Sequence, residues 1–109
     1  MTKLIKKTQT VTFNGEKLTP IIGQYANGQT SIQLIDQDGM PYMVASVAHD
    51  VNIAYNEVII KNYSENEGIL EALIEAEIID KPFCEIPTGF VTLYVAELCD
   101  IDSTLDQRI

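Results

Sequence analysis

Basic residues are scarce in this sequence. Seven Lys and Arg stand against sixteen Asp and Glu, which gives a formal net charge of −9 at neutral pH. Three of the seven are Lys3, Lys6 and Lys7, so residues 8–109 hold four basic and sixteen acidic side chains, a net charge of −12. Such a surface repels phosphate backbones and anionic lipids. Direct binding to nucleic acid or to a membrane is therefore the least favoured class of function.

Long apolar runs are missing too. No stretch approaches the roughly 20 apolar residues that cross a bilayer, and no apolar segment of a secretory signal follows the basic start MTKLIKKTQT. We therefore expect a cytoplasmic protein. Hydrophobic residues still make up 46% of the chain, which is enough for a core and excludes a disordered tail.

Residues that carry out chemistry are few. Cys84 and Cys99 are not spaced as Cys-x-x-Cys, and with the single His49 they do not reach the four ligands of a zinc site. We expect two partly buried thiols. Asp50 follows His49, but neighbours in sequence do not orient an imidazole against a carboxylate. The sequence thus predicts no catalytic residues, no metal and no cofactor, and a protein that is not an enzyme.

The first half of the chain alternates polar and apolar residues in a way typical of strands. Gly-containing turns separate the runs, and the Asn14-Gly15 pair suits the positive φ angles of a type I′ hairpin turn. Pro20 cannot donate to a strand ladder, so we expect its strand to lie at an edge or to bulge near Pro20 and Gly23. The four runs are residues 8–13, 17–25, 30–36 and 41–48, and the turns are Asn14-Gly15, Asn27-Gly28 and residues 36–39.

The second half predicts a loop at residues 49–56, a short strand at 57–61, one helix within 62–80, a short strand near 83–86 and a strand at 90–98. The last strand is apolar on both faces and is expected to be central and covered on both sides. The fold class is α+β: a curved, mostly antiparallel β-meander of about five to seven strands packed against one helix. We expect a single domain over residues 1–109, with flexible ends at 1–7 and 100–109.

The helix carries the clearest local signals. Ser64 and Glu67 fit the S-x-x-E capping box, in which each side chain bonds the backbone amide of the other residue. Helical periodicity then places four apolar residues on the inward face. They are Ile69, Leu70, Leu73 and Ile74.

Negative charge on this helix is not balanced. Glu67, Glu71 and Glu75 recur every four residues on the outward face, and each like-charge pair costs roughly 0.2–0.5 kcal/mol. Glu75, Glu77 and Asp80 lie near the negative end of the helix dipole. Two interpretations stay open. The acidic face is either merely solvated or presented to a basic partner, in which case Tyr63 is the nearest aromatic neighbour.

Three segments resemble a family of small proteins of unknown function carried by phages, plasmids and conjugative elements. They are TVTFNGEKLTP, QYANGQTSIQLID and NYSENEGILEALIEAEII with PTGFV after it, and the resemblance covers about residues 10–98. It implies a mobile-element accessory protein and transfers no catalytic residue. In such proteins we expect a helix-terminating Gly where this chain has Glu77.

These observations favour a non-enzymatic accessory protein that acts by protein–protein binding. In its most concrete form it inhibits a host defence nuclease or another nucleic-acid-binding protein, because an acidic surface can occupy a groove built for phosphates. One alternative is a homo-oligomeric assembly protein that pairs a strand near Pro20–Tyr25 or at 41–48. Another is a small-ligand protein with a pocket that includes His49. The expected partner-binding residues are Glu67, Glu71, Glu75, Glu77, Asp80 and Tyr63.

Overall fold

A computed structural model describes residues 5–6, 10–54 and 56–99. The predicted flexible ends at 1–7 and 100–109 lie outside these residues, except for Ile5 and Lys6. Tyr55 also lies outside them. The elements are β1 (Ile5–Lys6), β2 (Val11–Phe13), β3 (Glu16–Gln24), β4 (Thr30–Ile35), β5 (Pro41–Val44), β6 (Glu57–Lys61), the 3₁₀ helix η1 (Ser64–Asn66), α1 (Ile69–Glu75), β7 (Cys84–Pro87) and β8 (Thr92–Glu97).

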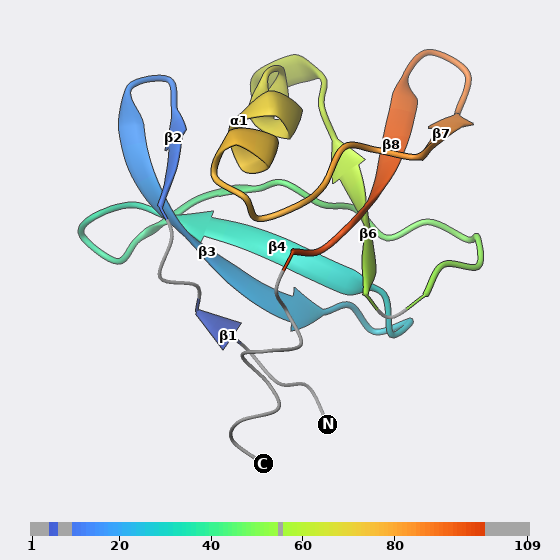
Figure 1. Ribbon diagram of the computed structural model, residues 1–109, viewed down its shortest axis with the longest axis horizontal. Coiled ribbons are helices and arrows are strands. Elements are labelled where there is room, and N and C mark those ends of the chain that lie inside the picture. Colours follow the sequence, from blue (N-terminus) through green and yellow to red (C-terminus); the bar gives the residue numbers. More distant parts are fainter. Residues whose placement is uncertain (1–4, 7–9, 55, 100–109) are drawn as a thin grey trace.

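The strands form two antiparallel sheets. The first has the order β1-β3-β4-β5, with β2 paired to the early part of β3, and the second has the order β6-β8-β7. Helix α1 lies over the strands between β2 and β6 and contacts both (Figure 1). The α+β class is confirmed, but the single meander is wrong. The meander ends after β5, and the chain then builds a second sheet.

The β2–β3 hairpin follows its sequence signals. Asn14 and Gly15 both have positive φ, 53° and 77°, as a type I′ turn requires. Val11 and Phe13 are buried and Thr12 between them is exposed, which is the predicted alternation. The turn at 36–39 is also confirmed, because Gly39 donates its amide to the Asp36 carbonyl oxygen at 3.0 Å.

Strand β3 is not an edge strand, contrary to expectation. It pairs with β4 from Thr19 to Gln24 without a register shift, so it does not bulge there either. On its other side β2 pairs as far as Leu18 and β1 pairs from Ile21 onward. Pro20 falls in the gap between these two partners. A residue that lacks an amide hydrogen is tolerated there because no ladder bond is needed.

Strand β5 continues into a segment that serves both sheets. Ala45 donates its amide to the Ile32 carbonyl oxygen in β4 at 2.9 Å, and its own carbonyl oxygen accepts from Lys61 in β6 at 2.9 Å. In a regular antiparallel pair, that carbonyl oxygen would accept from the Ile32 amide. The Ile32 amide donates instead to the Ser46 hydroxyl oxygen at 2.8 Å. The Ser46 hydroxyl thus satisfies the Ile32 amide at the point where the chain leaves the first sheet for the second.

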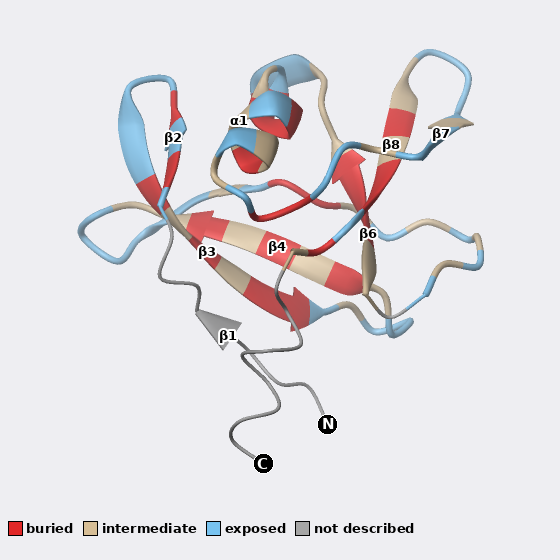
Figure 2. Cartoon of the chain, viewed as in Figure 1, coloured by how far each residue is buried: buried red, intermediate tan, exposed pale blue. Residues whose placement is uncertain are grey.

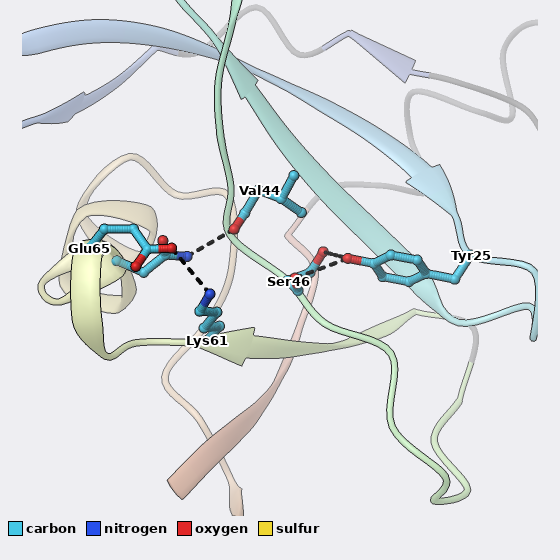
Figure 3. A network of polar contacts seen from close by, with 6 residues as sticks. Tyr25, Val44, Ser46, Lys61 and Glu65 are labelled. Atoms are coloured by element: carbon cyan, nitrogen blue, oxygen red, sulfur yellow. Dashed lines mark hydrogen bonds and ion pairs between the residues drawn. The ribbon is translucent and has the colours of Figure 1, made fainter. Parts of the chain in front are cut away.

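Tyr25 completes the bonding of Ser46. The tyrosine hydroxyl lies 2.9 Å from both the Ser46 carbonyl oxygen and the Ser46 Oγ (Figure 3). It can donate to the carbonyl oxygen while it accepts the serine proton, and Ser46 Oγ still accepts from Ile32. Ser46 is 2% exposed, so these bonds replace the water that its hydroxyl group would otherwise bind.

The second sheet separates two apolar clusters, and Figure 2 shows buried residues along β3, β4, β6 and β8. Val58, Ile60 and Ala96 face α1 and the first sheet, whereas Ile59, Leu93 and Val95 face the other way. Strand β8 is therefore central and covered on both faces, as predicted. One detail differs. Phe90, which the prediction included in the strand, precedes it and is fully exposed.

The predicted loop at 49–56 is confirmed over its described residues, and one side chain holds it in place. Gln29 accepts from the His49 amide at 2.9 Å and donates to the carbonyl oxygens of His49 and Val51 at 2.8 and 2.9 Å. These bonds imitate a strand ladder, because the amide side chain carries the same donor and acceptor as the backbone. The loop can then lay Val51 and Ile53 against the second cluster.

We predict that Ser46→Ala lowers the free energy of unfolding by about 1–3 kcal/mol, because it leaves the buried Ile32 amide without an acceptor. Tyr25→Phe should cost less, about 0.5–1.5 kcal/mol. Ser31→Ala on the half-buried face of β4 is the matched control and should change stability by no more than about 0.5 kcal/mol. Urea unfolding followed by circular dichroism measures all three. Equal effects of S46A and S31A would contradict the role given to Ser46.

Candidate functional site

The acidic segment at 62–80 forms a shorter α-helix than its pattern predicts. The 3₁₀ helix η1 ends at Asn66, and α1 begins only at Ile69. Gly68 separates them with a φ of 97°, a left-handed conformation that glycine adopts without strain. A β-carbon on Gly68 would also lie 3.5 Å from the Phe13 ring, so the helix start is seated against β2.

The predicted capping box is wrong. Ser64 has a left-handed φ of 55° rather than the extended conformation of a cap, and its side chain makes no capping bond. Asn62 caps the helix instead, because its Oδ1 accepts from the amides of Gly68 and Leu70, both at 3.0 Å. The 3₁₀ turn folds the chain back so that a residue from well before the helix reaches the first amides.

The apolar stripe of the helix is confirmed. Ile69, Leu70 and Leu73 are buried, and Ile74 packs against the same cluster while half-buried. A helix of seven residues is too short to be stable alone in water. Its position therefore depends on this burial and on the bonds at its two ends.

The helix ends in a Schellman motif with Glu77 at the left-handed position. The φ of Glu77 is 62°. Its amide donates to the Ile74 carbonyl oxygen and the Ile78 amide donates to the Leu73 carbonyl oxygen, both at 3.0 Å. Leu73 and Ile78 are also both fully buried, which supplies the apolar contact of the motif. The resemblance led us to expect glycine at this position, and the backbone there has the conformation that glycine favours.

The predicted partner-binding carboxylates are exposed, but they do not form one continuous row. Glu71 and Glu75 lie one turn apart on α1, whereas Glu67 precedes the helix, so one like-charge pair of the expected two exists. Glu77 follows the last turn. Asp80 lies further along, and its carboxylate accepts from the Cys99 thiol at 3.4 Å.

These carboxylates have almost no basic neighbours. Residues 10–99 contain three basic side chains, Lys17, Lys61 and Lys81, and thirteen acidic ones, which gives a net charge of −10. Within the described part of the chain the one ion pair joins Lys61 to Glu65 at 3.3 Å. A hydrogen bond from the Glu65 backbone and the nearby Lys61 lower the pKa of Glu65. Glu67, Glu71, Glu75 and Glu77 have no such partner among the described residues.

Tyr63 is not brought together with the helix carboxylates. Its ring packs with Ile59 and Val95 in the cluster on the far side of the second sheet, and Lys61 Nζ lies 5.4 Å from the ring centroid. Tyr63 therefore sits with Lys61 and Glu65, away from the outward face of α1.

An exposed apolar strip on and beside β5 was not predicted from the sequence. Met40, Tyr42 and Val44 are 59%, 40% and 45% exposed, and we refer to these three residues as the β5 strip. The pairing of β5 with β4 shifts register between Met43 and Pro41, so Tyr42 lies at an irregularity of the strand. Residues 39–48 contain no charged side chain in an otherwise acidic chain. That uncharged run is the sequence signal for the strip. Phe83 and Phe90 are exposed elsewhere, next to β7 and in the β7–β8 turn.

The small-ligand alternative requires a pocket that includes His49. A depression lies beside the 49–54 loop, but His49 does not line it. The residues that line this depression are Asn27, Gln29 and Asn52 with their neighbours. The Gln29 side chain is already committed to the loop backbone, so it offers little to a ligand. The depression therefore gives a ligand-binding role no support.

Within the described ranges, no group of three or more His, Cys, Asp or Glu is placed to hold a metal ion. Cys84 is exposed, Cys99 is half-buried, and the two do not form a disulfide. No described helix is long and apolar enough to span a membrane.

Comparisons with known proteins add no relative. No protein-family model, no curated protein and no solved structure matches the chain significantly.

We predict that Asn62→Ala destabilises the fold by about 0.5–2 kcal/mol, because two amides at the start of α1 lose their acceptor. Ser64→Ala, which removes the side chain that the sequence pattern favours as the cap, should change stability by no more than about 0.5 kcal/mol. Chemical denaturation of both variants shows which of the two residues caps the helix. A larger loss in S64A than in N62A would contradict the assignment.

We also predict that Glu77→Gly stabilises the fold by about 0.5–1 kcal/mol. Relief of the left-handed penalty, roughly 1–2 kcal/mol, exceeds the extra flexibility that glycine gives the unfolded chain. Glu77→Gln removes only the charge near the helix end and should stabilise by about 0.3 kcal/mol. Glu75→Gly within the helix should instead destabilise by about 1 kcal/mol. Thermal unfolding ranks the three variants, and a destabilised E77G would refute the backbone argument.

Proposed function

We propose that this protein acts by binding another protein through acidic residues at the outer face and C-terminal end of α1. The observation that carries the proposal is a set of exposed carboxylates, including Glu71, Glu75 and Glu77, that form no ion pair with any described residue. The partner is a basic protein, most concretely a host defence nuclease or another nucleic-acid-binding protein. The chain acts as an inhibitor by occupying the surface that otherwise holds phosphates.

Two physical features support an interaction role for these carboxylates. Glu71 and Glu75 repel each other one turn apart, at a cost of roughly 0.2–0.5 kcal/mol. Glu77 adds negative charge at the negative end of the helix dipole, in a conformation that disfavours any side chain. Both features lower stability, and no contact within the described structure offsets either of them. A basic partner would do so directly.

The electrostatic character also fits the mode of action. A net charge of −9 speeds the encounter with a basic protein and repels its nucleic-acid competitor. The resemblance to mobile-element proteins supports the same proposal, since an accessory protein of such an element gains from blocking a host nuclease. A cytoplasmic location is part of this proposal.

The test is affinity capture from a host lysate with three immobilised forms of the chain. The wild type is compared with E71K/E75K and with D50K/E85K, which changes the net charge equally at exposed positions away from α1. We expect the wild type and D50K/E85K to retain the same basic proteins, and E71K/E75K to lose them. Bound proteins should elute as salt rises from about 0.1 to 1 M, because the Debye length falls from about 10 to 3 Å.

Circular dichroism of each variant confirms that the fold is kept. If E71K/E75K folds and retains the same proteins as the wild type, the acidic face is only solvated and the proposal fails. If both double variants lose the same proteins, net charge rather than the helix face is responsible.

A further inference from the structure

The β5 strip is unusual for a surface of this charge. Its residues Met40, Tyr42 and Val44 are each at least 40% exposed, on a chain with sixteen acidic residues. Strand β5 is the last strand of the first sheet, where exposed apolar residues are usually replaced by charged ones to prevent association. An uncharged apolar strip at a sheet edge indicates a binding surface.

The backbone edge beside the strip is already covered at Val44. Asn66 of η1 donates from Nδ2 to the Val44 carbonyl oxygen at 2.8 Å, and Asn66 itself is 2% exposed. A strand from another chain cannot pair at this carbonyl group without displacing η1. Recognition at the strip therefore takes place through its side chains.

Carboxylates lie at both ends of the strip. At one end, the Asp36 carboxylate accepts from the amides of Asp38 and Met40, each at 2.9 Å, which places the acidic β4–β5 turn next to Met40. At the other end, the bond from Asn66 to Val44 brings η1 against the strand, and Glu65 and Glu67 are the residues on either side of Asn66. Glu67, Asp38 and Glu65 are exposed.

Charge decides which occupant this surface fits. A second copy that paired its strip antiparallel to the first would bring the 36–38 turn of one copy toward Glu65 and Glu67 of the other. Asp36 and Asp38 of one copy would then meet Glu67 and the Lys61–Glu65 ion pair of the other at each end. The excess of negative charge across that interface is costly. A partner segment with an apolar centre and a basic rim meets no such repulsion.

We propose that the β5 strip is the apolar centre of a docking surface for a basic protein segment in which apolar side chains are flanked by Lys or Arg. Met40, Tyr42 and Val44 bury the apolar side chains of that segment, and Asp36, Asp38 and Glu67, which form no ion pair within the described residues, pair with its cations. This deepens the proposed function, because it names the contacts that give affinity to an otherwise electrostatic encounter. Interfaces draw most of their affinity from a few buried residues, with tyrosine prominent among them.

The test uses a defined probe, the peptide acetyl-(Lys-Val)₄-amide, with acetyl-(Lys-Ser)₄-amide as the probe of equal charge. Binding to the full chain is followed by ¹⁵N NMR titration at about 0.1 M salt, where charges beyond about 10 Å are screened. We expect the Lys-Val peptide to shift the amides of residues 38–46 and to bind at least tenfold more tightly than the Lys-Ser peptide. Y42S/V44S should remove this advantage, whereas F83S/F90S, which changes two apolar residues exposed elsewhere, should keep it.

Each other outcome overturns the proposal. Equal affinity for the two peptides would mean that charge alone binds them, and an equal loss in both double variants would mean that any exposed apolar residue serves. A concentration-dependent dimer in sedimentation equilibrium that disappears in Y42S/V44S would assign the strip to self-association. The E71K/E75K variant separates the strip from the helix face. Suppose that E71K/E75K retains the host proteins of the wild type and that Y42S/V44S no longer binds the Lys-Val peptide more tightly than the Lys-Ser peptide. The proposed role of the helix face is then wrong, whereas the proposed role of the β5 strip is supported.

Discussion

The arrangement of the whole chain depends on the point where one strand leaves the first sheet for the second. At Ala45 the backbone carbonyl oxygen turns from β4 to β6, and the amide of Ile32 loses its regular acceptor. The Ser46 hydroxyl supplies the replacement, and Tyr25 holds that hydroxyl from the other side. Because a buried unpaired amide costs about 1–3 kcal/mol, the crossing is favourable only with such a side chain in place. Through this crossing the chain reaches β6, on which the second sheet is built.

The helix is positioned by its ends and by its buried face rather than by its own propensity. Asn62 satisfies the first amides, the Schellman motif satisfies the last carbonyl groups, and Ile69, Leu70 and Leu73 fill the space between the sheets. None of the outward carboxylates takes part in this. Their exposure is a result of how the apolar face is seated, which is why they can be assigned to a partner without conflict with the fold.

The local elements were predictable because their causes are local. Asn14-Gly15 specifies its turn, alternation specifies β2, β4 and β8, and helical spacing specifies which side of α1 is buried. The errors have a common cause. A capping box at Ser64 is compatible with the sequence. Asn62 caps the helix instead, because Gly68 separates η1 from α1 and η1 turns the chain back toward Asn62. Likewise, Pro20 suggests an edge, but two short partners share the other side of β3 and leave a gap at the proline.

The sequence by itself determined the sign and the excess of charge, the strand and turn pattern, and the uncharged run at residues 39–48. Only the tertiary structure decided that there are two sheets, which carboxylates form no ion pair among the described residues, and that the acidic 36–38 turn and η1 lie at opposite ends of the β5 strip. Those outcomes rest on bonds between residues about 20 apart, such as Asn66 to Val44 and Tyr25 to Ser46. Such bonds leave no periodic trace in a sequence, because each needs only one polar side chain at one position.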